Sequence, residues 1–253
     1  MLTRARSERR EISERRERYE RQIPLLGEDG QERIRDASVF IAGAGGLGSL
    51  SAIYLAAAGI GRIAIADFDT IDPSNLNRQI LHWSDDVARM KIDSAREKLV
   101  KINPDVEIEI IAEKIDEDNA SELVGGSDLI VDAMDNFRAR YLLNKAAIAR
   151  NIPLFHGAVH GFVGQVTTVI PGVTACLRCI FQNDPPEGVF PIIGATCGVV
   201  ASIQVNEVLK YISCTGTLAT NRLLFWNGAD ATMSEIRVDR DPRCVDCRVA
   251  GVD

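Results

Sequence analysis

The stretch GAGGLG at residues 43 to 48 has the composition and spacing of a nucleotide-binding loop. It places Gly43, Gly45, Gly46 and Gly48 between an apolar run and a helical segment. Glycine accepts a positive φ and lets the backbone approach a ligand closely, and the free N–H groups of the following helix bind phosphate. The spacing G-x-G-x-x-G therefore indicates an adenine nucleotide, with both NAD and ATP open.

Polar residues follow the next apolar segment and extend this candidate site. Asp67 ends that segment about 20 residues beyond the loop, where a carboxylate binds the ribose hydroxyls of a nucleotide. Cationic side chains beside a glycine loop suit a polyphosphate better than hydride transfer. The further candidates for nucleotide binding are Asp69, Asn75, Arg78, Gln79 and Lys91.

A third apolar segment ends in DAMDN, at residues 132 to 136. Carboxylates at the carboxyl end of a strand, near phosphates, are suitable Mg²⁺ ligands. We favour Asp135 over Asp132 as the ligand because Asp135 lies nearer the expected pocket. In the alternative reading, Asp135 or Asn136 caps the helix that begins at Phe137. The two roles are compatible.

Two C-x₂-C pairs predict a metal site. Four thiolates in such pairs close a tetrahedral zinc site without an open position, which is typical of a structural metal. Redox pairs are the less favoured alternative. The site would join the C-terminal tail to the body of the protein. Its ligands would be Cys176, Cys179, Cys244 and Cys247.

Other reactive side chains receive weaker assignments. Cys197 stands near a predicted helix start, and such a position can lower the pKa of a thiol. We nevertheless expect Cys197 to be a small buried apolar residue without a chemical role. His156 and His160 are expected to be structural or to lie at the rim of a pocket. Cys214 ends a helix and receives no role.

The elements that position these residues alternate along the chain. Apolar segments at 38–45, 62–69, 106–113 and 128–135 predict strands, separated by helices at 47–59, 84–104, 117–124 and 137–151. This order predicts a doubly wound, Rossmann-like parallel α/β sheet. The helix at 84–104, capped by Ser84 or Asp85, would place Lys91 a turn and a half inside it.

After residue 151 the pattern changes to adjacent antiparallel strands. Segments 152–159 and 161–172 precede a helix at 198–213, and 221–229 and 232–240 form a closing pair. We predict a single domain over residues 1–253. Its parts are an N-terminal helical arm at 1–25, a nucleotide-binding half at 37–150 and a C-terminal half at 151–253 that carries the zinc ligands.

Composition limits the classes of function. The 253 residues carry 29 Lys and Arg against 36 Asp and Glu, and this acidic excess argues against a nucleic-acid partner. No apolar run approaches the about 20 residues of a membrane span, and no secretory signal is visible, so a cytoplasmic location is expected. The Arg- and Glu-rich residues 4–21, with pairs such as Glu14/Arg18, predict a solvated helix.

The motifs follow one another in the order RYERQ, VFIAGAGGLGS, ADFDTIDPSNLNRQ, the helix with Lys91, DAMDN, CLRC and CVDC. From about Arg18 to Cys247 this series resembles the ThiF/MoeB/HesA adenylyltransferases, relatives of ubiquitin-activating enzymes. The resemblance implies an enzyme that uses ATP and Mg²⁺ to adenylate the C-terminal Gly-Gly carboxylate of a ubiquitin-like β-grasp sulfur carrier.

The resemblance implies a role for each matching residue. Asp67 would hold the ribose, Asp135 would bind Mg²⁺, and the four cysteines would form the family's structural zinc site. Arg21 would reach the triphosphate of the neighbouring subunit in a homodimer. The catalytic groups would be Arg21, Arg78, Lys91 and Asp135, and the phosphates would be held by Asn75, Arg78 and Lys91.

The chain also departs from some relatives. The loop FQNDPPEGVFP, at residues 181–191, contains no cysteine, so a covalent thioester step is not expected. No rhodanese-like domain follows, so sulfur is expected to come from another protein. The pathway stays open among thiamine, molybdopterin, tRNA thiolation and similar routes. The alternatives to this enzyme are an NAD-dependent oxidoreductase and a non-catalytic nucleotide-binding scaffold.

Overall fold

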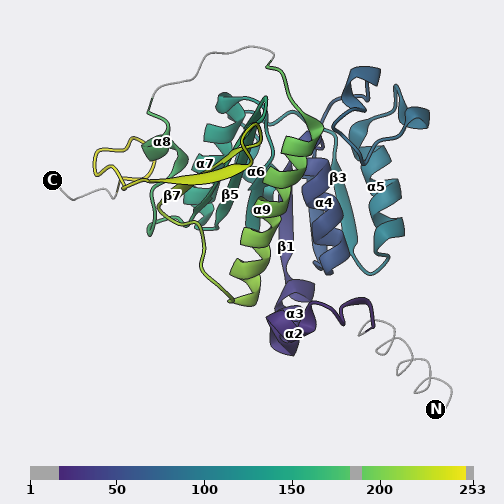
Figure 1. Ribbon diagram of the computed structural model, residues 1–253, viewed down its shortest axis with the longest axis horizontal. Helices are drawn as coiled ribbons and strands as arrows, with labels where there is room; N and C mark the ends of the chain where they lie inside the picture. The colour runs from purple at the N-terminus through teal and green to yellow at the C-terminus, as the bar shows by residue number, and fades with distance from the viewer. Residues whose placement is uncertain (1–16, 183–189, 249–253) are drawn as a thin grey trace.

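The computed structural model describes residues 17–182 and 190–248. Most of the predicted helix at 4–21, including Glu14 of the Glu14/Arg18 pair, lies outside these residues. The centre of the described part is an eight-stranded sheet in the order β3-β2-β1-β4-β5-β6-β7-β8 (Figure 1). The strands are β1 Ser38–Ala42, β2 Arg62–Ala66, β3 Glu107–Ile111, β4 Leu129–Asp132, β5 Leu154–His160, β6 Val163–Val169, β7 Arg222–Asn227 and β8 Thr232–Arg237.

The first five strands run parallel and the last three pair antiparallel. The parallel strands need long crossover connections, and helices supply them. The predicted parallel sheet with C-terminal antiparallel strands is therefore confirmed. The α-helices are α2 Ile23–Leu26, α3 Glu28–Asp36, α4 Gly46–Ala58, α5 Lys91–Ile102, α6 Ala120–Val124, α7 Phe137–Arg150, α8 Leu177–Ile180 and α9 Gly194–Ser213; η1 Pro73–Asn75 and η2 Ser84–Asp86 are short 3₁₀ turns.

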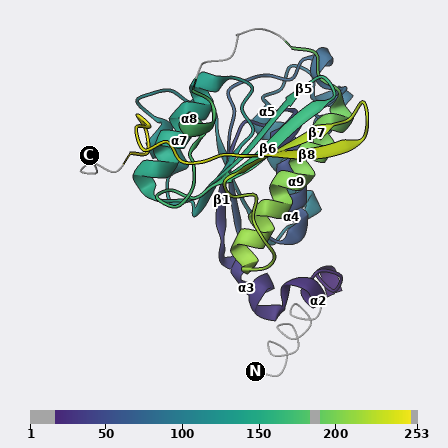
Figure 2. The same cartoon turned by 60° about the vertical axis from the view of Figure 1, so that its left-hand side comes forward.

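Helices cover both faces of the sheet (Figures 1 and 2). Side chains alternate between the faces along a strand, so Val39 and Ile41 of β1 pack with α4, α5 and α9, whereas Phe40 and Ala42 pack with α6 and α7. Both sets of side chains are fully buried. The sheet is thus a rigid support whose carboxyl edge carries the loops after β1, β2 and β4.

The predicted helix at 84–104 was wrong at its start. Residues 84–86 form the turn η2, Ala88 has φ of 71°, and the helix α5 begins at Lys91. The backbone of Met90 instead forms a β-bridge with Thr70. Lys91 is therefore the first residue of α5 rather than a turn and a half inside it, because a left-handed residue cannot continue a helix.

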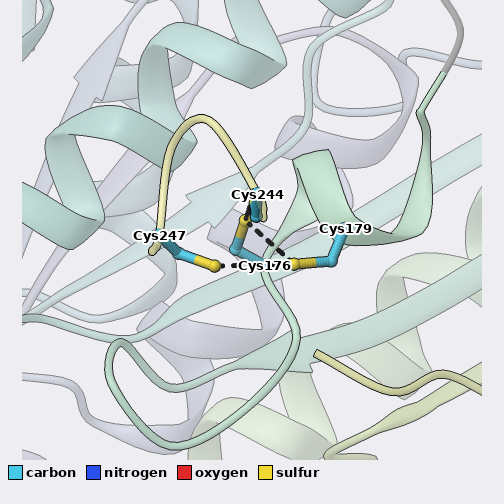
Figure 3. A group of neighbouring side chains, drawn as sticks. All are labelled: Cys176, Cys179, Cys244 and Cys247. Atoms are coloured by element: carbon cyan, nitrogen blue, oxygen red, sulfur yellow. Dashed lines mark hydrogen bonds between the residues drawn. The ribbon is translucent and has the colours of Figure 1, made fainter. Parts of the chain in front are cut away.

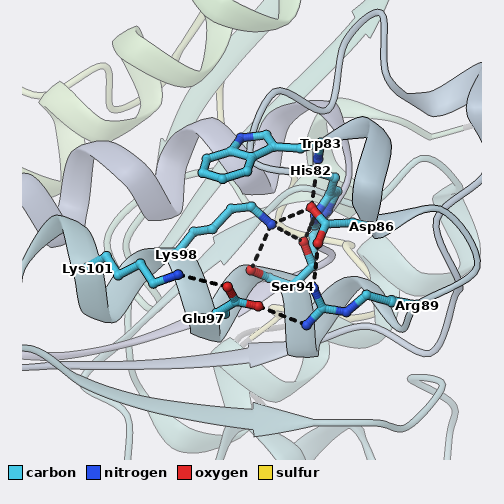
Figure 4. A network of polar contacts seen from close by, with 9 residues as sticks. His82, Trp83, Asp86, Arg89, Ser94, Glu97, Lys98 and Lys101 are labelled. Atoms are coloured by element: carbon cyan, nitrogen blue, oxygen red, sulfur yellow. Dashed lines mark hydrogen bonds and ion pairs between the residues drawn. The ribbon is translucent and has the colours of Figure 1, made fainter.

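A buried ion pair fixes η2 against α5 (Figure 4). The Lys98 ammonium contacts the Asp86 carboxylate and lies 4.7 Å from the centre of the Trp83 ring. Burial alone would raise the pKa of Asp86, but the hydrogen bond from Lys98 and the Trp83 N–H outweigh it and hold the pKa at about 2.

The depressed pKa predicts a specific loss of stability in acid. Asp86 is charged in the folded protein above pH 2 but protonates near pH 4 in the unfolded chain, so its contribution is present above pH 4 and is lost as the pH falls towards 2. Urea unfolding gives the free energy of unfolding of the wild type and of Asp86→Asn. The difference between these two free energies should be about 1.5 kcal/mol smaller at pH 2.5 than at pH 6. An equal difference at both pH values would contradict this assignment.

The N-terminal segment packs at the end of α4 that is remote from the glycine loop. Gly59, in the left-handed conformation at φ of 86°, closes α4 and lies against the Tyr19 ring. The Gln22 amide donates to the Ala58 carbonyl at 2.8 Å, and Arg18 donates to the Ile102 carbonyl at 3.0 Å. Within the described residues, no helix is both long enough and apolar enough to cross a membrane.

Candidate nucleotide site and metal centre

The glycine loop turns sharply between β1 and α4. Gly43 has φ of 96°, and its N–H donates to the Ala66 carbonyl at 2.8 Å, which ties the loop to the end of β2. At Gly48, a Cβ would lie 1.8 Å from the Gly43 carbonyl oxygen. Gly45 is the N-cap of α4, whose first amides have no helical partner. The loop is therefore a cradle that only small residues can form.

This crowding predicts that Gly48→Ala cannot keep the loop. Because the clash is with backbone, the turn must move, and we expect a loss of roughly 3 kcal/mol or more in unfolding free energy. Gly45→Ala is the matched control, since a Cβ at Gly45 meets nothing closer than the Gln79 amide nitrogen at 3.8 Å. Thermal unfolding should place Gly45→Ala within about 1 kcal/mol of the wild type. Equal stability of the two variants would contradict the crowding.

Asp67 lies at the end of β2 and holds two backbone amides. Its carboxylate accepts hydrogen bonds from the N–H of Ala44, at 2.7 Å, and of Asp69, at 2.8 Å. Burial raises the pKa of Asp67, although the Lys91 charge and the two amides oppose that shift. The carboxylate thus fastens the glycine loop to the loop after β2, at the place predicted for ribose binding.

Lys91 is buried at the start of α5. It is 6% exposed, and its ammonium donates to the Asp69 carboxylate at 2.7 Å. The Lys91 N–H also donates to the Asp69 carbonyl at 3.0 Å. A buried ammonium needs an anionic partner, and here Asp69 supplies it. The predicted residues Asp67, Asp69 and Lys91 are therefore brought together.

Three predicted residues come from the segment around η1. The Arg78 guanidinium donates to the Ser74 carbonyl at 2.8 Å, and the Arg78 Cγ lies 3.5 Å from where a Cβ of Gly46 would stand. The Gln79 side chain is buried against Gly45, and its Oε1 has no partner among the described residues. The Asn75 amide oxygen accepts the Asp72 N–H within a capping box. An orphaned buried oxygen beside a glycine cradle fits a site that a nucleotide completes.

The loop after β4 lies beside the glycine loop, since a Cβ at Gly43 would lie 3.2 Å from the Ala133 carbonyl oxygen. Asp135 is exposed on this loop, and its carboxylate accepts from the Asn136 amide at 3.3 Å. Asn136 caps α7 by accepting the Ala139 N–H at 2.9 Å. Of the two candidates for the helix cap, Asn136 is therefore the one that caps α7. The Asp135 carboxylate faces solvent.

Asp132, in contrast, is engaged inside the protein. Its carboxylate is fully buried, lies 2.7 Å from His156 Nδ1 and accepts the Met134 N–H at 3.1 Å. Arg140 holds the other backbone polar group of the same residue by donating to the Met134 carbonyl at 2.7 Å. Asp132 and Arg140 thereby fix the backbone that leads into Asp135. These geometries support the preference for Asp135 as the metal ligand.

Arg140 and His82 are buried at the site, and the sequence did not predict a role for either of them. His82 lies 3.0 Å from the Ala44 carbonyl oxygen of the glycine loop. Arg140 occupies the inner face of α7 among apolar neighbours, and a cation at such a position is the signal that could have identified it. His156 is structural, as expected. His160 is exposed beside Phe190, with ring centres 5.1 Å apart.

Cys197 is a small buried residue, as expected from the sequence. Its Sγ would lie 3.0 Å from a Cβ at Gly46, so α9 packs directly against the glycine loop. Burial raises the pKa of the Cys197 thiol, although the Arg78 charge opposes that shift. A thiol with a raised pKa is a poor nucleophile, so this geometry favours a packing role.

The four cysteines of the two C-x₂-C pairs converge in one buried cluster (Figure 3). The distances between Sγ atoms are 3.8 Å for Cys176–Cys179, 3.6 Å for Cys176–Cys244 and 3.5 Å for Cys179–Cys247. Sulfurs bound tetrahedrally 2.3 Å from one zinc ion lie about 3.8 Å apart. The cluster therefore has the dimensions of a zinc site.

Surrounding groups hold the two knuckles together. Asn144 of α7 accepts the Leu177 N–H at 2.9 Å and donates to the Asp246 carboxylate at 3.0 Å, so one side chain ties both knuckles to the domain. The Asp241 N–H donates to Cys179 Sγ at 3.4 Å. Burial raises the pKa of Cys179 to about 11, so its thiolate requires a compensating cation.

Among the described residues predicted for the nucleotide site, Arg21 is the one that lies away from the others. It is exposed and adjoins Gln22, which contacts the C-terminal end of α4 at Ala58. The glycine loop is at the other end of this 13-residue helix, about 20 Å away along its axis. Within one chain, Arg21 and the loop are therefore separated.

A glycine loop at the carboxyl edge of a doubly wound sheet, with cations and carboxylates converging on it, defines a nucleotide-binding α/β protein. Comparison of the sequence identifies the family: the chain belongs to the ThiF family, which it matches over residues 19–248. The resemblance found in the motifs is thereby confirmed.

Individual relatives agree with this assignment. The chain is 40% identical to the SAMP-activating enzyme E1 of Haloferax volcanii, over 94% of this chain and 90% of that protein. It is 38% identical to the sulfur carrier protein adenylyltransferase of Thermus thermophilus, over 91% and 90% of the two chains. The crystal structure of E. coli MccB with MccA-N7isoASN has the same fold, with a TM-score of 0.83 and 24% identity over 92% of this chain and 74% of that one.

Proposed function

We propose that this protein adenylates the C-terminal carboxylate of a ubiquitin-like β-grasp sulfur carrier that ends in Gly-Gly, using ATP and releasing pyrophosphate. The observation that carries the proposal is the convergence of the glycine cradle, Arg78, buried Lys91 and Asp135 at one sheet edge. Membership of the ThiF family and the names of the two relatives support it. Two cations at this edge fit a triphosphate better than the nicotinamide of an oxidoreductase.

The chemistry requires binding and charge stabilisation. A carrier carboxylate attacks the α-phosphorus of ATP, a new C–O–P linkage forms, and the bond to the pyrophosphate oxygen breaks. Because the carboxylate is already ionised, no general base is needed. Negative charge develops on the phosphate oxygens, and the Arg78 guanidinium and Lys91 ammonium stabilise it. Lys91 would exchange its Asp69 partner for a phosphate when ATP binds.

The remaining residues have supporting roles in the proposal. Asp67 holds the ribose, and Asn75 and Gln79 contact the nucleotide around the cradle. Mg²⁺ would be held by Asp135 and would neutralise charge on the phosphates. Asp132 and Arg140 keep the Asp135 loop in place by binding the backbone N–H and the carbonyl of Met134, respectively.

We assign Arg21 to the site of a partner subunit. Because Arg21 lies about 20 Å from the glycine loop of its own chain, a contribution to catalysis requires a second copy. A homodimer in which each N-terminal arm reaches the other site meets this requirement. Residues 37–150 would bind ATP, and residues 151–253 would hold the carrier. The four cysteines would bind structural zinc, which suits the cytoplasm, where thiols stay reduced.

Carrier-dependent exchange of labelled pyrophosphate into ATP tests the proposal. The expected result is exchange with a β-grasp protein that ends in Gly-Gly. A separate sulfur donor would then be needed only for the later step. ATP binding without any carrier-dependent exchange would favour the non-catalytic scaffold instead. Binding of NAD(H) in place of ATP would favour the oxidoreductase.

A further inference from the structure

A chain of buried hydrogen bonds runs from the Asp86–Lys98 ion pair to the glycine loop (Figure 4). The Lys98 ammonium donates to Ser94 Oγ at 2.7 Å, and Ser94 Oγ lies 2.9 Å from His82 Nδ1. His82 Nε2 lies 3.0 Å from the carbonyl oxygen of Ala44. His82 is 3% exposed and Ser94 is fully buried, so water does not compete for these bonds.

The Ala44 carbonyl fixes the tautomer of His82. This carbonyl can only accept, so His82 Nε2 carries the proton and Nδ1 is an acceptor that faces the Ser94 hydroxyl. The Ser94 oxygen is then free to accept from Lys98. Burial lowers the pKa of His82; the Ala44 bond opposes this, but the Lys98 and Lys91 charges add to it. The imidazole is therefore neutral, with a single tautomer that serves both contacts.

Ala44 is held at both of its backbone polar groups. Its N–H donates to Asp67 at 2.7 Å, and its C=O accepts from His82. The peptide that joins Ala44 to Gly45 is trans, so its C=O and the Gly45 N–H point in opposite directions. By drawing the carbonyl inward, His82 turns the Gly45 N–H away from itself. That amide is the N-cap amide of α4 and has no partner within the described part of the chain.

We propose that His82 is a positioning residue for ATP: its Nε2–H holds the Ala44 carbonyl and thereby presents the Gly45 N–H to a nucleotide phosphate. This inference rests on the proposed function for the identity of the nucleotide, and it concerns ATP binding rather than the carrier. An amide already fixed in direction loses little freedom on binding, which favours affinity. Nothing in the ATP chemistry requires His82 to touch the substrate.

Two substitutions at the same position separate the two contacts. In His82→Gln the amide nitrogen takes the place of Nε2 and retains a donor for the Ala44 carbonyl. In His82→Asn the shorter amide takes the place of Nδ1, faces Ser94 and leaves the carbonyl without a donor. Isothermal titration calorimetry with ATP and Mg²⁺ measures Kd for each, and thermal unfolding of the same samples measures stability.

We expect His82→Asn to raise the Kd for ATP about tenfold, and His82→Gln to stay within about threefold of the wild type. A purely structural role would instead make Kd follow the melting temperature in both variants. Equal Kd values in the two variants, or Kd values that track melting temperature, would overturn the proposal.

The same titration separates this inference from the proposed function. If the unsubstituted protein binds ATP but gives no carrier-dependent exchange, the carrier assignment fails and the comparison of His82 variants still decides the inference. Absence of ATP binding by the unsubstituted protein would overturn both.

Discussion

Asp135→Ala should abolish adenylation while leaving the protein folded. The Asp135 carboxylate is exposed, and among the described residues it accepts one weak hydrogen bond, from Asn136 at 3.3 Å, so its removal costs little stability. As the proposed Mg²⁺ ligand it acts where charge develops on the phosphates. We expect carrier-dependent pyrophosphate exchange to fall by about 10³-fold, with a much smaller change in the melting temperature.

Asp36→Ala is a suitable control because Asp36 is an exposed carboxylate at the end of α3, away from the sheet edge that carries the site. It should retain wild-type exchange. Activity of Asp135→Ala within about tenfold of the wild type, with unchanged Mg²⁺ dependence, would rule out the assigned ligand.

Cys244→Ser should release the metal and destabilise the C-terminal half. Cys244 is buried 3.6 Å from Cys176, and the cluster joins segments that are far apart in the chain. A site of four thiolates that loses one ligand binds zinc much more weakly. We expect the zinc content to fall from about one ion per chain to well below that value, and the melting temperature to fall by roughly 10 °C.

Cys214→Ser provides the matched control, since Cys214 is an exposed thiol outside the cluster. Its zinc content, measured by mass spectrometry of the metal, and its melting temperature should equal those of the wild type. Chelation of zinc from the wild type should reproduce the lower melting temperature of Cys244→Ser. A Cys244→Ser protein that keeps both zinc and stability would show that the cluster does not depend on a metal.

The sequence predicted the sheet well because its strands are short apolar runs between clear helix signals. Each strand from β1 to β5 was located, and so was the change to antiparallel pairing after residue 151. The convergence of the two C-x₂-C pairs was also predicted, because four thiols with that spacing suit one kind of site.

The segment before α5 shows where local pattern fails. Residues 84–90 have helical composition, but the Asp86 side chain bonds to Lys98 and the Trp83 N–H, and Ala88 adopts a left-handed conformation. These tertiary contacts override propensity and move the helix start to Lys91. The roles of His82 and Arg140 were missed for the same reason. Both act on backbone carbonyls, at Ala44 and Met134, that no sequence pattern marks.

The proposed adenylation is tested most directly by the intact mass of a Gly-Gly carrier after incubation with this protein, ATP and Mg²⁺. We expect an AMP adduct on the carrier's C-terminal carboxylate. The adduct should be absent from a carrier that lacks the terminal glycines and from reactions with Asp135→Ala. An unmodified carrier in the presence of bound ATP, or an adduct on a side chain instead of the C-terminus, would contradict adenylation of the C-terminal carboxylate.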